Sequence, residues 1–298
     1  MKTLKSYRDQ ARESLKNNWW KAIGAYLLLS LVINIPSFIT ELYSTLEIEA
    51  PWTSIVLNVL TILLVPFSLG YTLSLLTRTR TGEGNFLKNS FEHTRDRYGA
   101  LMGLLWLMIL IFMVAVGIVA GAIGAIYSLE FNIILKYLLI AVLAVVGLVI
   151  YFKLAYGYRM AAYLLHDDTS LTALKALKKS AEMMQGKKRV LLMLDLSILH
   201  WLFYPSILIV IAALLIENTL GSSEAVGVLI AVIAAPIVLA LLGLSFVLNA
   251  YSTAATAHFY EDLKAETYGE DDVEEEAVEA VEEAEAEEVE TEEVHTED

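Results

Sequence analysis

Six long apolar stretches, separated by charged connectors, constrain this chain more than any other feature of its sequence. A helix needs about 20 mostly apolar residues to cross the hydrocarbon core of a bilayer. Six stretches are about that long or longer: 22–40, 52–76, 99–126, 132–155, 190–216 and 225–255. We therefore predict an all-α polytopic membrane protein with six transmembrane helices.

Prolines fall inside four of these stretches, at Pro36, Pro66, Pro205 and Pro236. Proline removes a helical hydrogen bond, but neighbouring helices in a membrane bundle can satisfy the freed carbonyl. We expect kinks at these positions and no helix ends.

The composition supports a membrane location, with 57% hydrophobic residues, 19% charged residues and a mean hydropathy of +0.58. Soluble proteins are closer to half apolar and a quarter charged. The chain has no cysteine, which excludes disulfides, thiol catalysis and cysteine-ligated metals. Charges occur throughout the first 21 residues, so we expect a retained first helix and no cleaved signal peptide.

Lysine and arginine lie on alternate connectors. They are concentrated before the first stretch, between the second and third, and between the fourth and fifth. The other connectors, around 41–51, 127–131 and 217–224, contain Glu and neither Lys nor Arg. Basic connectors face the cytoplasm, so we predict a multi-pass protein of the cytoplasmic (inner) membrane with both termini cytoplasmic. Lys136 is the exception, and it lies near enough to a helix end to snorkel.

Each basic segment also contains a short amphipathic pattern, which predicts three interfacial helices in the headgroup layer of an anionic inner leaflet. Asp168 or Thr169 would cap the third. Their apolar positions are Leu4, Tyr7, Ala11, Leu15 and Trp19; Leu87, Phe91, Thr94 and Tyr98; and Leu171, Leu174, Leu177, Ala181 and Met184. The lipid-facing basic residues of the third segment are Lys175, Lys178, Lys179, Lys187, Lys188 and Arg189.

Two sequence patterns recur at intervals of about 90 residues. LKNS at 87–90 resembles LKKS at 177–180, and a small residue precedes Tyr71, Tyr158 and Tyr251. We interpret these as three repeats, each an interfacial helix plus a two-span hairpin. Chance similarity among Leu-rich helices is the alternative.

The C-terminal end differs in composition from the rest. Residues 261–298 hold 20 acidic side chains and a single Lys. We predict a membrane domain over 1–264 and a disordered acidic tail over 265–298, because the tail has too little apolar surface to fold alone. The tail either only solvates the chain or tethers a basic protein partner.

The central run LTALKALKKSAEMMQGKKR, followed by LDLS, resembles the bacterial family known as domain of unknown function 975. ARESLKNNWWKA near the start and AYSTAATAHFYEDL near residue 264 are similar to the two ends of that family. One departure is His200-Trp201, where family members tend to have Gly-Trp. The resemblance implies location and topology and lends no catalytic residue.

Ionisable residues within a span are costly and define a candidate intramembrane polar site. Asp195 would pair with Lys153 or Arg159, relay protons or ions, or contact water. His200 is either hydrogen-bonded between helices or a titrating group. Tyr71, Tyr158 and Tyr251 either line a shared pathway or belong to an interfacial aromatic belt.

Two further patterns have structural explanations beside functional ones. His258 and Glu261, with Asp262 nearby, share a spacing used by metal sites, although a solvated helix end explains them better. The pairs Gly99 with Gly103 and Gly117 with Gly121 favour close helix packing.

We expect no enzyme, because the phosphate-binding, HExxH and GxSxG motifs are missing and nothing outside the spans could form a catalytic domain. We also expect no cofactor, no metal and no nucleic-acid partner, and the oligomeric state is open. Three hypotheses follow: a non-catalytic envelope or assembly component, a transporter or lipid-handling subunit, and an unrecognised membrane enzyme.

Overall fold

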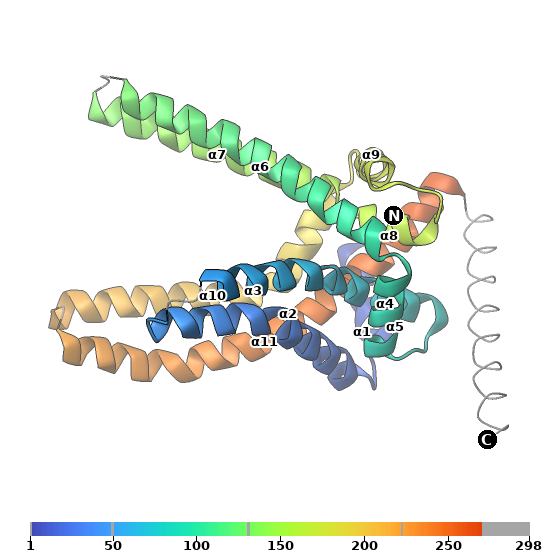
Figure 1. The fold of residues 1–298 in the computed structure, drawn as a ribbon, viewed down its shortest axis with the longest axis horizontal. Coiled ribbons are helices and arrows are strands. Elements are labelled where there is room, and N and C mark those ends of the chain that lie inside the picture. Colours follow the sequence, from blue (N-terminus) through green and yellow to red (C-terminus); the bar gives the residue numbers. More distant parts are fainter. Residues whose placement is uncertain (1, 49–50, 130–131, 222, 270–298) are drawn as a thin grey trace. The chain divides into compact units, whose positions relative to one another are not determined.

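The computed structural model describes residues 2–48, 51–129, 132–221 and 223–269 (Figure 1). Its elements within these ranges are helices, and they contain no strand. The predicted tail lies almost entirely outside the described residues, although helix α11 continues to Tyr268. The eleven helices are α1 (Leu4–Ser14), α2 (Trp19–Thr45), α3 (Pro51–Leu64), α4 (Pro66–Thr81), α5 (Phe86–Asp96), α6 (Tyr98–Ser128), α7 (Ile133–Gly157), α8 (Ala161–Asp167), α9 (Ala173–Met183), α10 (Lys188–Leu220) and α11 (Glu224–Tyr268).

Six helical segments of the described chain are long and apolar enough to cross a membrane. They are Trp19–Thr45, Trp52–Thr81, Tyr98–Ser128, Ile133–Asp167, Lys188–Ile216 and Ala225–Tyr268. The prediction of an all-α protein with six transmembrane helices is confirmed.

The chain divides into two compact units. The first unit holds Met1–Val32, Leu75–Phe86 and the chain from Leu192 onward, and the second unit holds Ile33–Ser74 and Leu87–Leu191. In the first unit α1 packs on α11, although the two are at opposite ends of the sequence. In the second unit α6 and α7 run side by side as a long hairpin (Figure 1).

Proline interrupts one of the four helices that contain it. α3 ends at Leu64 and α4 begins at Pro66, so the helix is interrupted at Val65, although Trp52–Thr81 as a whole forms one membrane-length segment. Pro66 has no amide proton, and a residue that precedes proline disfavours the α conformation. The helices that contain Pro36, Pro205 and Pro236 continue through them.

The three short amphipathic helices predicted to be interfacial are α1, α5 and α9, and each is 11 residues long. Thr3 caps α1 by accepting a hydrogen bond from the amide of Ser6, and Thr172 caps α9 by accepting one from the amide of Lys175. The cap predicted at Asp168 or Thr169 was therefore wrong. Asp168 follows α8 and accepts hydrogen bonds from the amide and hydroxyl of Ser170, at 3.0 and 2.6 Å. This local turn delays the start of α9.

The buried faces of these helices follow a common spacing. They are Tyr7, Ala11 and Leu15 on α1 and the residue after it; Phe86, Ser90 and Thr94 on α5; and Ala176, Leu177, Ser180, Met183 and Met184 on α9 and the residue after it. The first agrees with the apolar stripe predicted from the sequence. On α5 and α9 the buried face is shifted towards the serines, and Phe91 and Leu174 of the predicted stripes are 44% and 64% exposed.

Candidate functional site

Asp262 on α11 fixes the N-terminus of the chain in the first unit. Its Oδ2 atom accepts hydrogen bonds from the Tyr7 hydroxyl at 2.6 Å and from the Lys2 amide at 3.1 Å. The Lys2 ammonium lies 3.1 Å from the other carboxylate oxygen. Tyr7 is completely buried, with its ring edge-on to Phe259 at a centroid distance of 5.6 Å. A short polar cluster therefore attaches α1 to α11.

A second ion pair joins the end of α4 to α11. The Arg80 guanidinium donates from Nη2 and Nε to one carboxylate oxygen of Glu261, at 2.8 and 3.0 Å. Arg78, two residues earlier, donates to the carbonyl of Ser14 at 3.4 Å. The ends of α1, α4 and α11 are thus connected by charged side chains with defined partners.

The spacing of His258 and Glu261 was noted as one that metal sites use, with a solvated helix end as the preferred explanation, and the structure gives these half-buried residues partners within the protein instead. Glu261 is engaged by Arg80, and the His258 ring is hydrogen-bonded to the backbone of Gln10 on α1. The described residues include no group of three or more His, Cys, Asp or Glu able to hold a metal ion. His258 Nε2 and the side-chain oxygen of Gln10 are buried without a hydrogen-bond partner. His258 is therefore part of the contact between α1 and α11.

Asp195 lies within α10 and is only 4% exposed. Its Oδ1 atom accepts a hydrogen bond from the hydroxyl of Ser252 on α11, at 2.8 Å. The sequence did not indicate this partner, because serine is common in membrane helices and 57 residues separate the two. Lys153 and Arg159, the predicted partners, are exposed residues of the second unit, and that pairing stays a prediction.

His200 is half-buried, and its ring lies beside those of Trp201 and Tyr204, with centroid distances of 5.0 and 6.0 Å. These neighbours belong to the same helix, so aromatic packing is the environment observed for this histidine. The predicted hydrogen bond between helices and the alternative titrating role both stay predictions.

Ser180 on α9 joins the interfacial helix to the end of a span in the second unit. Its hydroxyl donates to the carbonyl of Gly157 at 2.8 Å and accepts from the amide of Met160 at 3.2 Å. Lys188 lies close to Gly157 and donates to the carbonyl of Lys153 at 3.2 Å. Carbonyls at the end of α7 are therefore satisfied by side chains from the segment that follows it.

An equivalent contact occurs between α4 and α5. A methyl group on Gly70 would collide with the Thr94 hydroxyl and the Ser90 carbonyl, so only glycine permits this approach. Phe67 and Phe91 pack beside it, with ring centroids 5.0 Å apart. The small residue before Tyr71, noted in the sequence, thus has a packing function.

The three repeated tyrosines have different environments. Tyr71 is buried, Tyr158 is half-buried, and Tyr251 donates its hydroxyl to the carbonyl of Arg8 at 3.0 Å. Tyr251 therefore contributes to the attachment of α1. The shared pathway and the aromatic belt both stay predictions.

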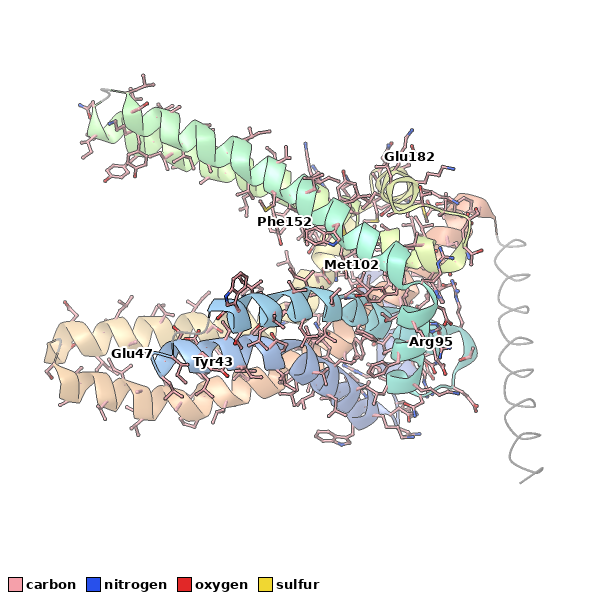
Figure 2. The ribbon with its side chains drawn as sticks, in the orientation of Figure 1. Tyr43, Glu47, Arg95, Met102, Phe152 and Glu182 are labelled. Atoms are coloured by element: carbon pink, nitrogen blue, oxygen red, sulfur yellow. The ribbon has the colours of Figure 1, made fainter. Side chains whose placement is uncertain are left out.

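The lysines predicted to face lipid form a charged surface on and after α9. Lys175, Lys178 and Arg189 are exposed, and Lys179, Lys187 and Lys188 are half-buried. Figure 2 shows Arg95 and Glu182 at one end of the second unit, and Glu47 at the other end. The charged interfacial helices of this unit therefore lie at the end away from the acidic connector.

Sequence reasoning missed one ring pair in the same unit. His93 on α5 and His166 on α8 are arranged edge to face, with centroids 4.6 Å apart. The residues are distant in sequence and have no shared motif, so the sequence contains no signal for their contact.

The membrane-length helices and the short amphipathic helices fastened to their ends define a multi-pass integral membrane protein. The chain belongs to the family described as protein of unknown function (DUF975), which matches residues 1–267. This confirms the resemblance seen in the sequence. No curated protein and no solved structure matches the chain.

Proposed function

We propose that this protein is a non-catalytic envelope or assembly component of the cytoplasmic membrane, with both termini in the cytoplasm. Its working surface would be the basic outer face of the interfacial helices, which contacts anionic lipid headgroups and recruits cytoplasmic partners. This location follows from the alternation of basic and acidic connectors.

The observation that carries the proposal is that exposed lysines lie beside exposed apolar side chains on α9, on α5 and in the segment that follows α1. On α9, Lys175 and Lys178 are exposed beside Leu174. On α5, Lys88 is exposed beside Phe91. After α1, Lys16 and Lys21 are exposed, and Trp20 is 85% exposed. Such a surface suits the headgroup layer, where apolar groups enter the acyl boundary and each cation contributes about 1 kcal/mol at an anionic leaflet.

The remaining polar groups support a structural role. Asp262, Glu261 and Ser180 all hold one helix against another. A catalytic site would instead bring several titratable groups towards one place where a substrate could bind. The hydrogen bonds and ion pairs of these three residues support a role in holding the short amphipathic helices, and so their basic surface, in place.

We also propose the threefold internal repeat. Buried residues recur at four-residue steps on both α5 and α9. The Ser90 carbonyl lies against Gly70 of α4, and the Ser180 hydroxyl donates to the carbonyl of Gly157 at the end of α7. After α1 and α9, Asn17 and Gly186 have similar positive φ angles of 67° and 73°. The helices α5 and α9 each pack on the end of the span that precedes them, whereas α1, which no span precedes, packs on the last span, α11.

A transport or lipid-handling role is the second candidate, and the burial of Asp195 within α10 favours it. An acid inside a span is costly and is often retained for ion or proton movement. Its hydrogen bond to Ser252 is also what a purely structural acid would make. Substitution of Asp195 distinguishes the two roles, as set out below.

The proposal is tested by measuring which lipids and proteins co-purify with the gently solubilised protein, by mass spectrometry. The triple variant Lys175→Gln, Lys178→Gln, Lys179→Gln should retain less anionic lipid relative to zwitterionic lipid than the wild type. Lys136→Gln is the control, because Lys136 lies in the first turn of α7, next to a connector predicted to face outward. Deletion of 267–298 should change the proteins that co-purify. Identical lipids and partners in all four proteins would overturn the proposal.

A further inference from the structure

The last acidic residues of α11 already pair with basic residues of the first unit. Asp262 binds Lys2 and Glu261 binds Arg80. α11 ends at Tyr268, about 9 Å beyond Asp262 by helical rise. The segment that follows therefore starts close to α1, which is the most basic part of this unit.

Residues 270–298 carry 17 acidic side chains and neither Lys nor Arg. Fully extended, these 29 residues reach about 95 Å. α1 is about 16 Å long by the same kind of measure. The segment is thus long enough to follow α1 along its whole length, and its charge is opposite.

A basic surface runs from the outer side of α1, opposite the side that contacts α11, to the first turn of α2. Lys5, Arg12, Lys16 and Lys21 are exposed, whereas Tyr7 is buried against α11. Two acidic residues, Asp9 and Glu13, share the segment, so residues 2–21 keep a net charge of +4 from six basic and two acidic side chains. We call Lys5, Arg12, Lys16 and Lys21 the N-terminal basic face.

We propose that residues 270–298 of the same chain dock on the N-terminal basic face and compete there with anionic lipid. Individual exposed ion pairs are weak, because water and salt screen them and both side chains lose conformational freedom. Many carboxylates tethered beside the face act at a high effective concentration, which makes the intramolecular contact favourable without a specific pocket. Docked in this way, residues 270–298 would regulate the access of anionic lipid to the basic surface of the proposed function. The competition with lipid rests on that proposed function, whereas the docking itself does not.

Pulsed electron paramagnetic resonance tests the docking directly, because the chain has no cysteine and accepts two introduced labels cleanly. Labels are attached to Asp9→Cys on α1 and Ala284→Cys, with the full chain in detergent. At about 0.05 M salt we expect a population of short distances, which moves to longer distances at about 1 M salt as charges are screened. The same lengthening should follow from Lys5→Gln, Lys16→Gln, Lys21→Gln.

The matched control is Lys175→Gln, Lys178→Gln, Lys187→Gln, which removes three charges from the α9 region and should leave the distances unchanged. Distances insensitive to salt and to the α1 substitutions would overturn the proposal. So would lengthening caused by the α9 variant, or loss of the short distances when labelled protein is diluted with unlabelled copies, which would place the tail on another chain.

Nanodiscs separate this proposal from the proposed function. Anionic lipid should lengthen the distances relative to nanodiscs of zwitterionic lipid alone. If salt and the α1 substitutions act as expected and lipid charge has no effect, the proposed lipid contact at α1 fails and the tail docking stands.

Discussion

Tyr7 and Asp262 are 255 residues apart in the sequence, and the tyrosine hydroxyl donates to the carboxylate over 2.6 Å. This bond attaches the first helix of the chain to the last described one. The family match also extends over both residues, from 1 to 267. Both residues of this contact therefore lie within the part of the chain that the family model covers.

Replacing Tyr7 by Phe should loosen this closure. The change removes a hydrogen bond to a charged acceptor while it keeps the ring against Phe259. We expect the free energy of unfolding to fall by about 1–3 kcal/mol, seen as a lower midpoint of thermal unfolding in detergent. Tyr127→Phe is the control, because its side chain is 60% exposed. Equal midpoints for the two variants would show that the bond adds nothing measurable.

Alkaline pH should weaken the same contact. Burial raises the pKa of Tyr7, and the hydrogen bond to Asp262 raises it further. A raised folded-state pKa contributes stability that is present below the unfolded value, about 10, and lost as the pH rises towards the folded value. The thermal midpoint should therefore fall above about pH 10. The fall should be smaller in Tyr7→Phe, and equal falls in both proteins would contradict the assignment.

Gly70→Ala should disrupt the contact between α4 and α5. The new methyl group would collide with Thr94 and with the backbone of Ser90, neither of which can rotate out of the way at low cost. We expect a loss of about 1–3 kcal/mol. Gly117→Ala has open space around it and should be neutral or stabilising by up to about 1 kcal/mol. Thermal unfolding of the two variants checks this, and equal stabilities would be inconsistent with the described packing.

Substitutions of Asp195 distinguish a structural acid from a transport group. Asp195→Asn keeps an oxygen that can accept from Ser252, whereas Asp195→Ala removes it. A structural role predicts near wild-type stability for Asn and a loss of about 1–3 kcal/mol for Ala. A transport role predicts that Asn stays folded and abolishes proton or ion flux in proteoliposomes. If wild type and Asn show the same flux, the second candidate function is excluded.

The number and nature of the membrane-length helices could be predicted from the sequence, because apolar stretches of membrane length have few other structural solutions. The short amphipathic helices between the spans were also predictable from charge and apolar periodicity, and their interfacial location stays a prediction. The face that each of these helices buries was harder to predict. Ser90 is buried because its backbone packs against Gly70, and Ser180 is buried because its hydroxyl bonds to the carbonyl of Gly157. The larger apolar residues Phe91 and Leu174 stay exposed.

Long-range partners could not be predicted from one sequence. Nothing near Asp195 in the sequence indicates Ser252, and nothing near Tyr7 indicates Asp262. The glycine pairs of α6 were predicted to favour close packing, within the chain or between copies, and only packing within the chain can be compared with the structure. Gly117 and Gly121 have no neighbour within 4 Å of an added methyl group, and the close approach of α6 and α7 is at Gly147 against Val119.

The account depends on the interfacial helices lying on the cytoplasmic side of the membrane. The most direct test is labelling of intact cells with a membrane-impermeant thiol reagent, using the single variants Glu47→Cys and Lys178→Cys in a chain without other cysteines. We predict that the cysteine at 47 is labelled in intact cells and the cysteine at 178 only after the membrane is opened. Labelling of both positions from the same side would contradict the account.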